Sequence, residues 1–111
     1  MLAKPYRVKS GQDFARVLSA GVRSGTAHLV VYLKVRQAGP ARVGLIVSKK
    51  VGNAVTRNQV KRRLRHVAAA ELPTLSPQAD IVIRALSPAS FADYAAELHT
   101  ALAGCKRKLG R

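Results

Sequence analysis

Residues 42–65, RVGLIVSKKVGNAVTRNQVKRRLR, pass from an apolar segment through a basic loop into a cationic helix. Arg42–Ser48 is rich in β-branched residues and predicts a strand. Asn53 or Thr56 can cap the helix that follows, and Pro73 marks its end. A further strand is predicted at 79–85, so the order strand, helix, strand favours a crossover within a mixed sheet.

Upstream of this segment, the sequence predicts one helix and up to two strands. Ser10 can cap a helix that buries Phe14, Val17 and Leu18 and ends at Gly21. The segment Leu29–Val35 has strand character, and Val22–Thr26 can add a short strand before it. The turn residues Ala38-Gly39-Pro40 predict that Leu29–Val35 and Arg42–Ser48 form a hairpin.

Downstream, a third helix is predicted to start at Ser87-Pro88 or at Ser90. Its apolar residues recur at helical spacing, and they are Phe91, Tyr94, Ala95, Leu98, Leu102, Cys105 and Leu109. Cys105 lies on that apolar face, so it is interpreted as a core residue.

Charge and size limit the classes of function. The chain has 111 residues, enough for one domain, with a formal net charge of +15 and a pI of about 11.4. No acidic residue occurs from Phe14 to Ala70, so the middle of the chain should form a positive surface for a polyanionic partner. One cysteine excludes an internal disulfide, and no apolar stretch approaches the roughly 18 residues that span a membrane. We therefore expect a cytoplasmic chain.

The second helix carries the strongest candidate binding site. Its polar face includes Arg57, Asn58, Lys61, Arg62 and Arg65, while Val60, Leu64 and Val67 form an apolar face. The spacing of Arg57, Lys61 and Arg65 causes mutual repulsion, which favours a bound anion over a simple solvated face. Lys49, Lys50 and the helix N-terminus can converge on a phosphate.

Catalysis by the protein itself is disfavoured. Hydrolysis with two metal ions requires several converging carboxylates, and the acidic residues are isolated in sequence. Three histidines could support acid–base cleavage, but nothing in the sequence places His28, His66 and His99 together. We expect no catalytic residue and no metal site in this chain.

The run from Arg42 to Arg65 resembles the signature of the bacterial ribonuclease P protein component. Its Ser-Lys-Lys, Gly-Asn-Ala-Val and Arg-Asn elements stand here at 48–50, 52–55 and 57–58. The resemblance implies an α/β (α+β) fold, with one domain over residues 1–111. It implies three helices and a small mixed four-stranded sheet in the order α-β-β-β-α-β-α, with a left-handed βαβ crossover around the arginine-bearing helix.

The resemblance also implies a function. The chain would be the protein subunit of ribonuclease P, an endoribonuclease whose RNA is the catalyst and which removes the 5′ leader of precursor tRNA. Magnesium would be bound mainly by that RNA. The RNA-binding residues carried over are Lys49, Lys50, Asn53, Arg57, Asn58, Lys61, Arg62 and Arg65, and Phe14 and Tyr32 would line a cleft for the leader. Leu18 stands where relatives often have a second aromatic residue.

Two alternatives remain open from the residues alone. A structural RNA-binding protein, such as a small ribosomal protein, would share this charge, size and mixture of helices and strands. A DNA-binding module is less favoured, because neither helix-turn-helix spacing nor a dimerisation heptad is present. DNA and membranes are therefore not expected as partners.

Overall fold

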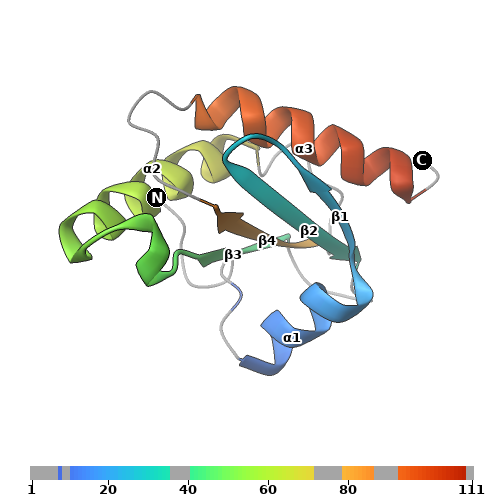
Figure 1. Ribbon diagram of the computed structural model, residues 1–111. Coiled ribbons are helices and arrows are strands. Elements are labelled where there is room, and N and C mark those ends of the chain that lie inside the picture. Colours follow the sequence, from blue (N-terminus) through green and yellow to red (C-terminus); the bar gives the residue numbers. More distant parts are fainter. Residues whose placement is uncertain (1–7, 9–10, 36–40, 72–78, 87–92, 110–111) are drawn as a thin grey trace.

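The computed structural model describes residues 8, 11–35, 41–71, 79–86 and 93–109. These residues form three α-helices and a four-stranded sheet, whose arrangement is drawn in Figure 1. The elements are, in chain order, α1 (Gly11–Ala20), β1 (Val22–Gly25), β2 (Leu29–Val35), β3 (Arg42–Ile46), the 3-10 turn η2 (Lys49–Val51), α2 (Ala54–Glu71), β4 (Ala79–Ala85) and α3 (Tyr94–Lys108). The predicted order of helices and strands is confirmed.

The strand order is β1-β2-β4-β3. β4 runs parallel to β3, with Val43 beside Ile81, and antiparallel to β2, with Tyr32 beside Val82. The predicted crossover is therefore present, with α2 as its helix. The predicted hairpin between β2 and β3 is wrong, because β4 lies between them. Burial explains this order, since every residue of β4 except Arg84 is buried and a strand of that kind belongs inside a sheet.

Two apolar clusters cover the two faces of the sheet, and Figure 1 shows α1 on the side opposite α2 and α3. The larger cluster joins alternate strand residues such as Val31, Ile81 and Ile83 to Leu64 of α2 and Leu98 of α3. The smaller cluster joins Val17 of α1 to Tyr32 and Val82, with Phe14, Val30 and Ile46 packed against it. Strand alternation thus sends one set of residues to α2 and α3 and the other set to α1.

Local signals account for the ends of the helices. The side chain of Asn53 caps α2, because its Oδ1 accepts a hydrogen bond from the Thr56 amide at 2.9 Å, whereas Thr56 lies inside the helix. Asp93 caps α3, with its carboxylate accepting from the Ala96 amide at 3.1 Å. This corrects the predicted start of α3, whose candidate caps Ser87 and Ser90 lie outside the described residues. A short side chain in the right place thus sets each start.

α1 ends before Gly21, as predicted. Only glycine fits at position 21, because a Cβ there would lie 2.6 Å from the Val17 carbonyl oxygen and 2.7 Å from that of Leu33. Leu18, by contrast, is 38% exposed, so its predicted burial is wrong. A helix of ten residues lying across a sheet buries only a narrow stripe, and here Val17 occupies it.

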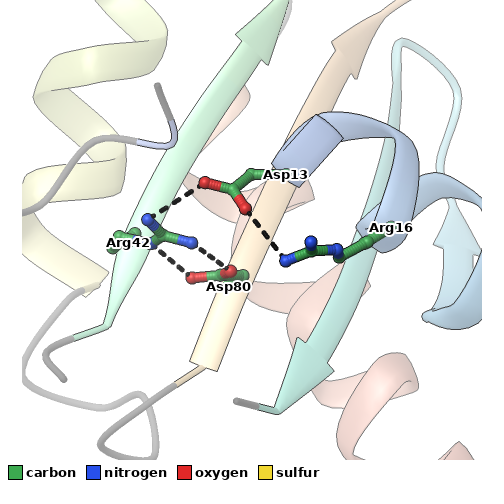
Figure 2. A network of polar contacts seen from close by, with 4 residues as sticks. All are labelled: Asp13, Arg16, Arg42 and Asp80. Atoms are coloured by element: carbon green, nitrogen blue, oxygen red, sulfur yellow. Dashed lines mark hydrogen bonds and ion pairs between the residues drawn. The ribbon is translucent and has the colours of Figure 1, made fainter. Parts of the chain in front are cut away.

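An arginine network ties α1 to the sheet (Figure 2). Arg42 donates to both carboxylate oxygens of Asp80, from Nε at 2.9 Å and from Nη2 at 2.7 Å. Its Nη1 lies 3.4 Å from Asp13 of α1, which also contacts Arg16 at 3.5 Å. The hydrogen bonds with Asp80 raise the pKa of Arg42, although burial acts in the opposite direction. Asp80 is only 3% exposed, so this bidentate pair compensates a buried charge.

Glu97 of α3 fixes the turn between β1 and β2. Its carboxylate accepts hydrogen bonds from the Thr26 hydroxyl at 2.6 Å and the His28 amide at 2.8 Å, and it lies 2.7 Å from the His28 ring. Burial opposes ionisation of Glu97, but these hydrogen bonds outweigh it and lower its pKa. A lowered folded-state pKa stabilises the fold at higher pH, and that stability is lost as the pH falls through the folded value.

Glu97→Gln is therefore expected to remove part of the acid sensitivity of the fold. The free energy of unfolding of the variant should be lower than that of the wild type near pH 7, and the difference should shrink as the pH falls below about 4.5, the ordinary value for Glu. Urea denaturation across this pH range measures both curves. A difference that stays constant with pH would contradict this account of Glu97.

Candidate nucleic-acid interface

The cations of α2 lie on both sides of its buried stripe. Val60, Leu64 and Ala68 face the core and fix the rotation of the helix about its axis. Lys61 and Arg65 then lie toward β3 and α1, where they are half-buried, whereas Asn58 and Arg62 are exposed to solvent. The single cationic face predicted from the sequence is thus divided by the core contact into a side near α1 and an outer surface.

Lys61 and Arg65 line a cavity together with Phe14 of α1, which we call the Phe14 cavity. Its volume is about 190 Å³, and Val8 and residues 43–45 complete its lining. The Val8 amide donates to the Val43 carbonyl oxygen at 2.9 Å, so Val8 lies against β3. A predicted cleft aromatic residue and two predicted RNA-binding cations therefore meet in one cavity.

Gly44 allows this arrangement. A Cβ at position 44 would lie 2.6 Å from Phe14 Cε1 and 2.7 Å from Cζ, so the ring occupies the space that any larger residue would need. Gly44 thus permits close packing between β3 and α1. Phe14 is only half-buried, which leaves part of its ring accessible beside the two cations.

The basic loop at residues 48–53 lies directly before α2 in the chain. Lys49 and Lys50 lie in η2, both exposed, one turn before the N-terminus of α2. Gly52 follows with φ of +152°, a backbone conformation that favours glycine, and its amide donates to the Lys49 carbonyl oxygen at 3.2 Å. The exposed Asn53 uses its side-chain oxygen to cap the helix, and its amide NH2 remains available to donate to a further partner.

Two of the predicted site residues are more buried than the sequence indicated. Tyr32 is 8% exposed and packs against Val17 and Val82, so its ring belongs to the core under α1. Arg57 is half-buried, and within the described part of the chain its buried Nε has no hydrogen-bond partner. A buried guanidinium donor that lacks an acceptor is costly, and such a group is suited to an acceptor supplied by a ligand.

The histidines and carboxylates do not form a common cluster in the described residues. The His28 ring contacts Glu97, and the exposed His99 ring lies 3.3 Å from Glu71. No group of three or more His, Cys, Asp or Glu side chains suited to a metal ion occurs within the ranges that the structure describes. Cys105 is buried, and burial raises the pKa of its thiol. None of the helices in these ranges is long and apolar enough to cross a membrane.

Sequence reasoning missed a second surface on α2. Gln59, Arg63 and His66 follow one another at helical spacing and line a larger cavity beside the first turn of α3. The spacing of three to four residues was a usable signal, but only the position of α3 shows that these side chains border a cavity. This surface is considered further below.

A mixed sheet with a cationic crossover helix, and a cavity where an aromatic ring meets two cations, define a small RNA-binding protein of the α/β class. The family model "Ribonuclease P" matches residues 2–109. The chain belongs to this family, whose curated members are named ribonuclease P protein components.

Individual relatives and solved structures agree with this family assignment. The ribonuclease P protein component of a Nocardioides species is 46% identical over 113 residues, covering 99% of this chain and 96% of that protein. The protein component of Kocuria rhizophila is 39% identical, covering 95% and 99%. The solved ribonuclease P protein of Staphylococcus aureus has a TM-score of 0.78 at 32% identity, covering 89% of this chain and 94% of that one.

Membership of the family establishes the general role of the chain. It is a subunit that acts in processing the 5′ end of tRNA, and its endoribonuclease activity belongs to the holoenzyme that it forms with the RNA subunit. The prediction from the resemblance is confirmed at this level, and a ribosomal role is not favoured.

Proposed function

We propose that α2 and the basic loop before it bind the catalytic RNA, and that the Phe14 cavity receives the 5′ leader of precursor tRNA. The meeting of Phe14 with Lys61 and Arg65 carries this proposal, because it joins an accessible ring to cations that also belong to α2. One protein surface can therefore contact both RNAs. The whole chain, residues 1–111, would act as a single RNA-binding domain in the cytoplasm.

Electrostatics supply the mechanism. Two RNAs repel each other through their phosphates, and a protein with a net charge of +15 placed between them lowers that repulsion. Magnesium, held mainly by the RNA, would perform the same screening in the absence of protein and would supply the metal-ion chemistry that hydrolysis needs. The protein would consequently lower the magnesium concentration at which the holoenzyme is active.

The test is cleavage of a precursor tRNA at low magnesium by the protein alone, a bacterial ribonuclease P RNA alone, and the mixture. Activity in the mixture only is the expected result, and higher magnesium should restore cleavage by the RNA alone. Cleavage at the leader junction by the protein alone would show catalytic groups in this chain. Failure to stimulate an otherwise active RNA would exclude the proposed role.

Tyr32 belongs to the proposed leader site only through its hydroxyl, because its ring packs in the core under α1 and does not line the Phe14 cavity. Tyr32→Ala would leave a cavity between Val17 and Val82 and destabilise the fold by about 3–5 kcal/mol, the usual range for a large aromatic residue. Tyr32→Phe removes the hydroxyl alone. We expect this variant to bind the catalytic RNA normally while its preference for precursor over mature tRNA decreases roughly 2- to 10-fold, the value of one hydrogen bond. Equal affinity changes for both tRNAs would remove Tyr32 from the leader site.

A further inference from the structure

We propose that the cavity between α2 and the first turn of α3 receives one unpaired nucleotide of the RNA that binds α2, with its base stacked on the Arg63 guanidinium. We call it the Tyr94 cavity, and its volume is about 670 Å³. Its lining includes Gln59, Arg62, Arg63 and His66 of α2 and Tyr94 of α3. Pockets of this size accommodate small organic ligands. The inference rests on the proposed function, because α2 must face RNA for a nucleotide to reach the cavity.

The Arg63 side chain is held in an orientation suited to stacking. Its Cζ lies 4.4 Å from the centroid of the Tyr94 ring, a cation–π distance. The Tyr94 ring itself is 2% exposed, so it forms a fixed support, whereas Arg63 is exposed and lines the cavity. Guanidinium planes stack on unpaired bases in RNA complexes. A base that enters here would contact an exposed guanidinium that the Tyr94 ring supports from the other side.

The Tyr94 hydroxyl is the second observation that indicates a ligand. It is buried and has no hydrogen-bond partner among the residues that the structure describes, although nearly all buried polar groups have one. Burial also raises the pKa of this hydroxyl, despite the nearby Arg63 charge, so it remains a donor at neutral pH. A nucleotide whose base stacks on Arg63 also carries ribose and phosphate oxygens outside the base plane, and one of these acceptors can supply the missing partner.

The remaining side chains suit a nucleotide more than an uncharged ligand. Gln59 and His66, seven residues apart on one side of α2, offer an amide and an imidazole for base edges. The exposed Arg62 can bind a phosphate. Asp93 also lines the cavity, but its Oδ1 already caps α3 through the Ala96 amide. A net charge of +15 favours RNA over a peptide as the source of the occupant.

Tyr94→Phe separates a ligand contact from a structural one. Deleting a hydroxyl that has no partner should leave the unfolding midpoint of the free protein unchanged or raise it, while the affinity for a ribonuclease P RNA transcript falls roughly 2- to 10-fold. These two effects differ in direction. An unchanged affinity, or a loss of affinity that accompanies a lower midpoint, would overturn the proposal.

Arg63→Lys tests the stacking surface, because it retains the charge and removes the plane. We expect the affinity for the same transcript to fall roughly 5-fold or more, the lower limit for loss of one stacked base. The matched control is Arg107→Lys, since Arg107 is an exposed residue in the last turn of α3 and outside the cavity. Equal affinities of the two variants would contradict base stacking at Arg63.

Direct binding completes the test. Adenosine 5′-monophosphate and ribose 5-phosphate are titrated separately into the full-length protein, and amide chemical shifts are followed by NMR. Shifts at Val67 and Ala95, which line the cavity, are expected with the nucleotide only. Equal shifts with both compounds would show phosphate binding without base recognition and overturn the proposal. Wild-type protein that binds the transcript and stimulates cleavage, with variants that match it, would refute this inference and leave the proposed function intact.

Discussion

Arg42→Ala is expected to lower the free energy of unfolding by about 3–5 kcal/mol, the range for removing one partner of a buried ion pair. Asp80 is only 3% exposed, so it would remain buried but would lose both hydrogen bonds from the guanidinium. The contact between Arg42 and Asp13 would also be lost, and with it a link between α1 and β3. Urea denaturation followed by circular dichroism at moderate salt measures the change.

Two controls make this prediction specific. Arg16→Ala removes a cation from the same network, but the Arg16 side chain is 67% exposed, so a change of less than about 1 kcal/mol is expected. Replacing both partners, as in Arg42→Met with Asp80→Leu, should recover much of the stability, because no buried charge then remains without its partner. A loss in Arg42→Ala no larger than that in Arg16→Ala would contradict a structural role for the pair.

Arg65→Ala is expected to weaken binding to the catalytic RNA by about 1–3 kcal/mol, the range for a charge-assisted hydrogen bond. Arg65 lines the Phe14 cavity and is half-buried, so its guanidinium is less screened by solvent than those on the outer surface of α2. The affinity of the wild type should fall steeply with salt, by roughly 0.7 to 0.9 log units per log unit of salt for each contacted phosphate. In Arg65→Ala the dependence of affinity on salt should be weaker by the amount that corresponds to about one contacted phosphate.

Arg107→Ala is the matched control for charge. Arg107 is an exposed residue in the last turn of α3, so its removal changes the net charge by the same amount as Arg65→Ala. We expect a much smaller loss of affinity than for Arg65→Ala. Equal losses would show that diffuse attraction to the net charge dominates, and an affinity that does not depend on salt would contradict the electrostatic account altogether.

Local patterns were sufficient for the elements and for much of the candidate site. The spacing of Val60, Leu64 and Val67 predicts the apolar side of α2, and the structure buries Val60 and Leu64 together with Ala68, while Val67 is partly buried. Short capping residues account for the start of α2 at Asn53. For α3 the cap is Asp93 rather than the predicted serines, because several polar residues in this region are equally suitable by residue type alone.

The larger differences concern contacts between residues far apart in the chain. Ala38-Gly39-Pro40 favours a hairpin locally, but burying both faces of β4 places that strand between β2 and β3. Tyr32 belongs to the core because α1 packs over it, a contact that the alternation of β2 does not specify. The proximity of Phe14 to Gly44, and of Arg63 to Tyr94, likewise joins segments about thirty residues apart.

By itself, therefore, the sequence determined the net charge, the order of helices and strands, and the cationic character of α2, because each depends on residue type and local spacing. Only the tertiary structure decided the order of strands in the sheet, the burial of Tyr32 and the two cavities beside α2. Strand pairing and side-chain burial minimise the exposed apolar surface of the whole chain, and that quantity depends on all the packed elements together.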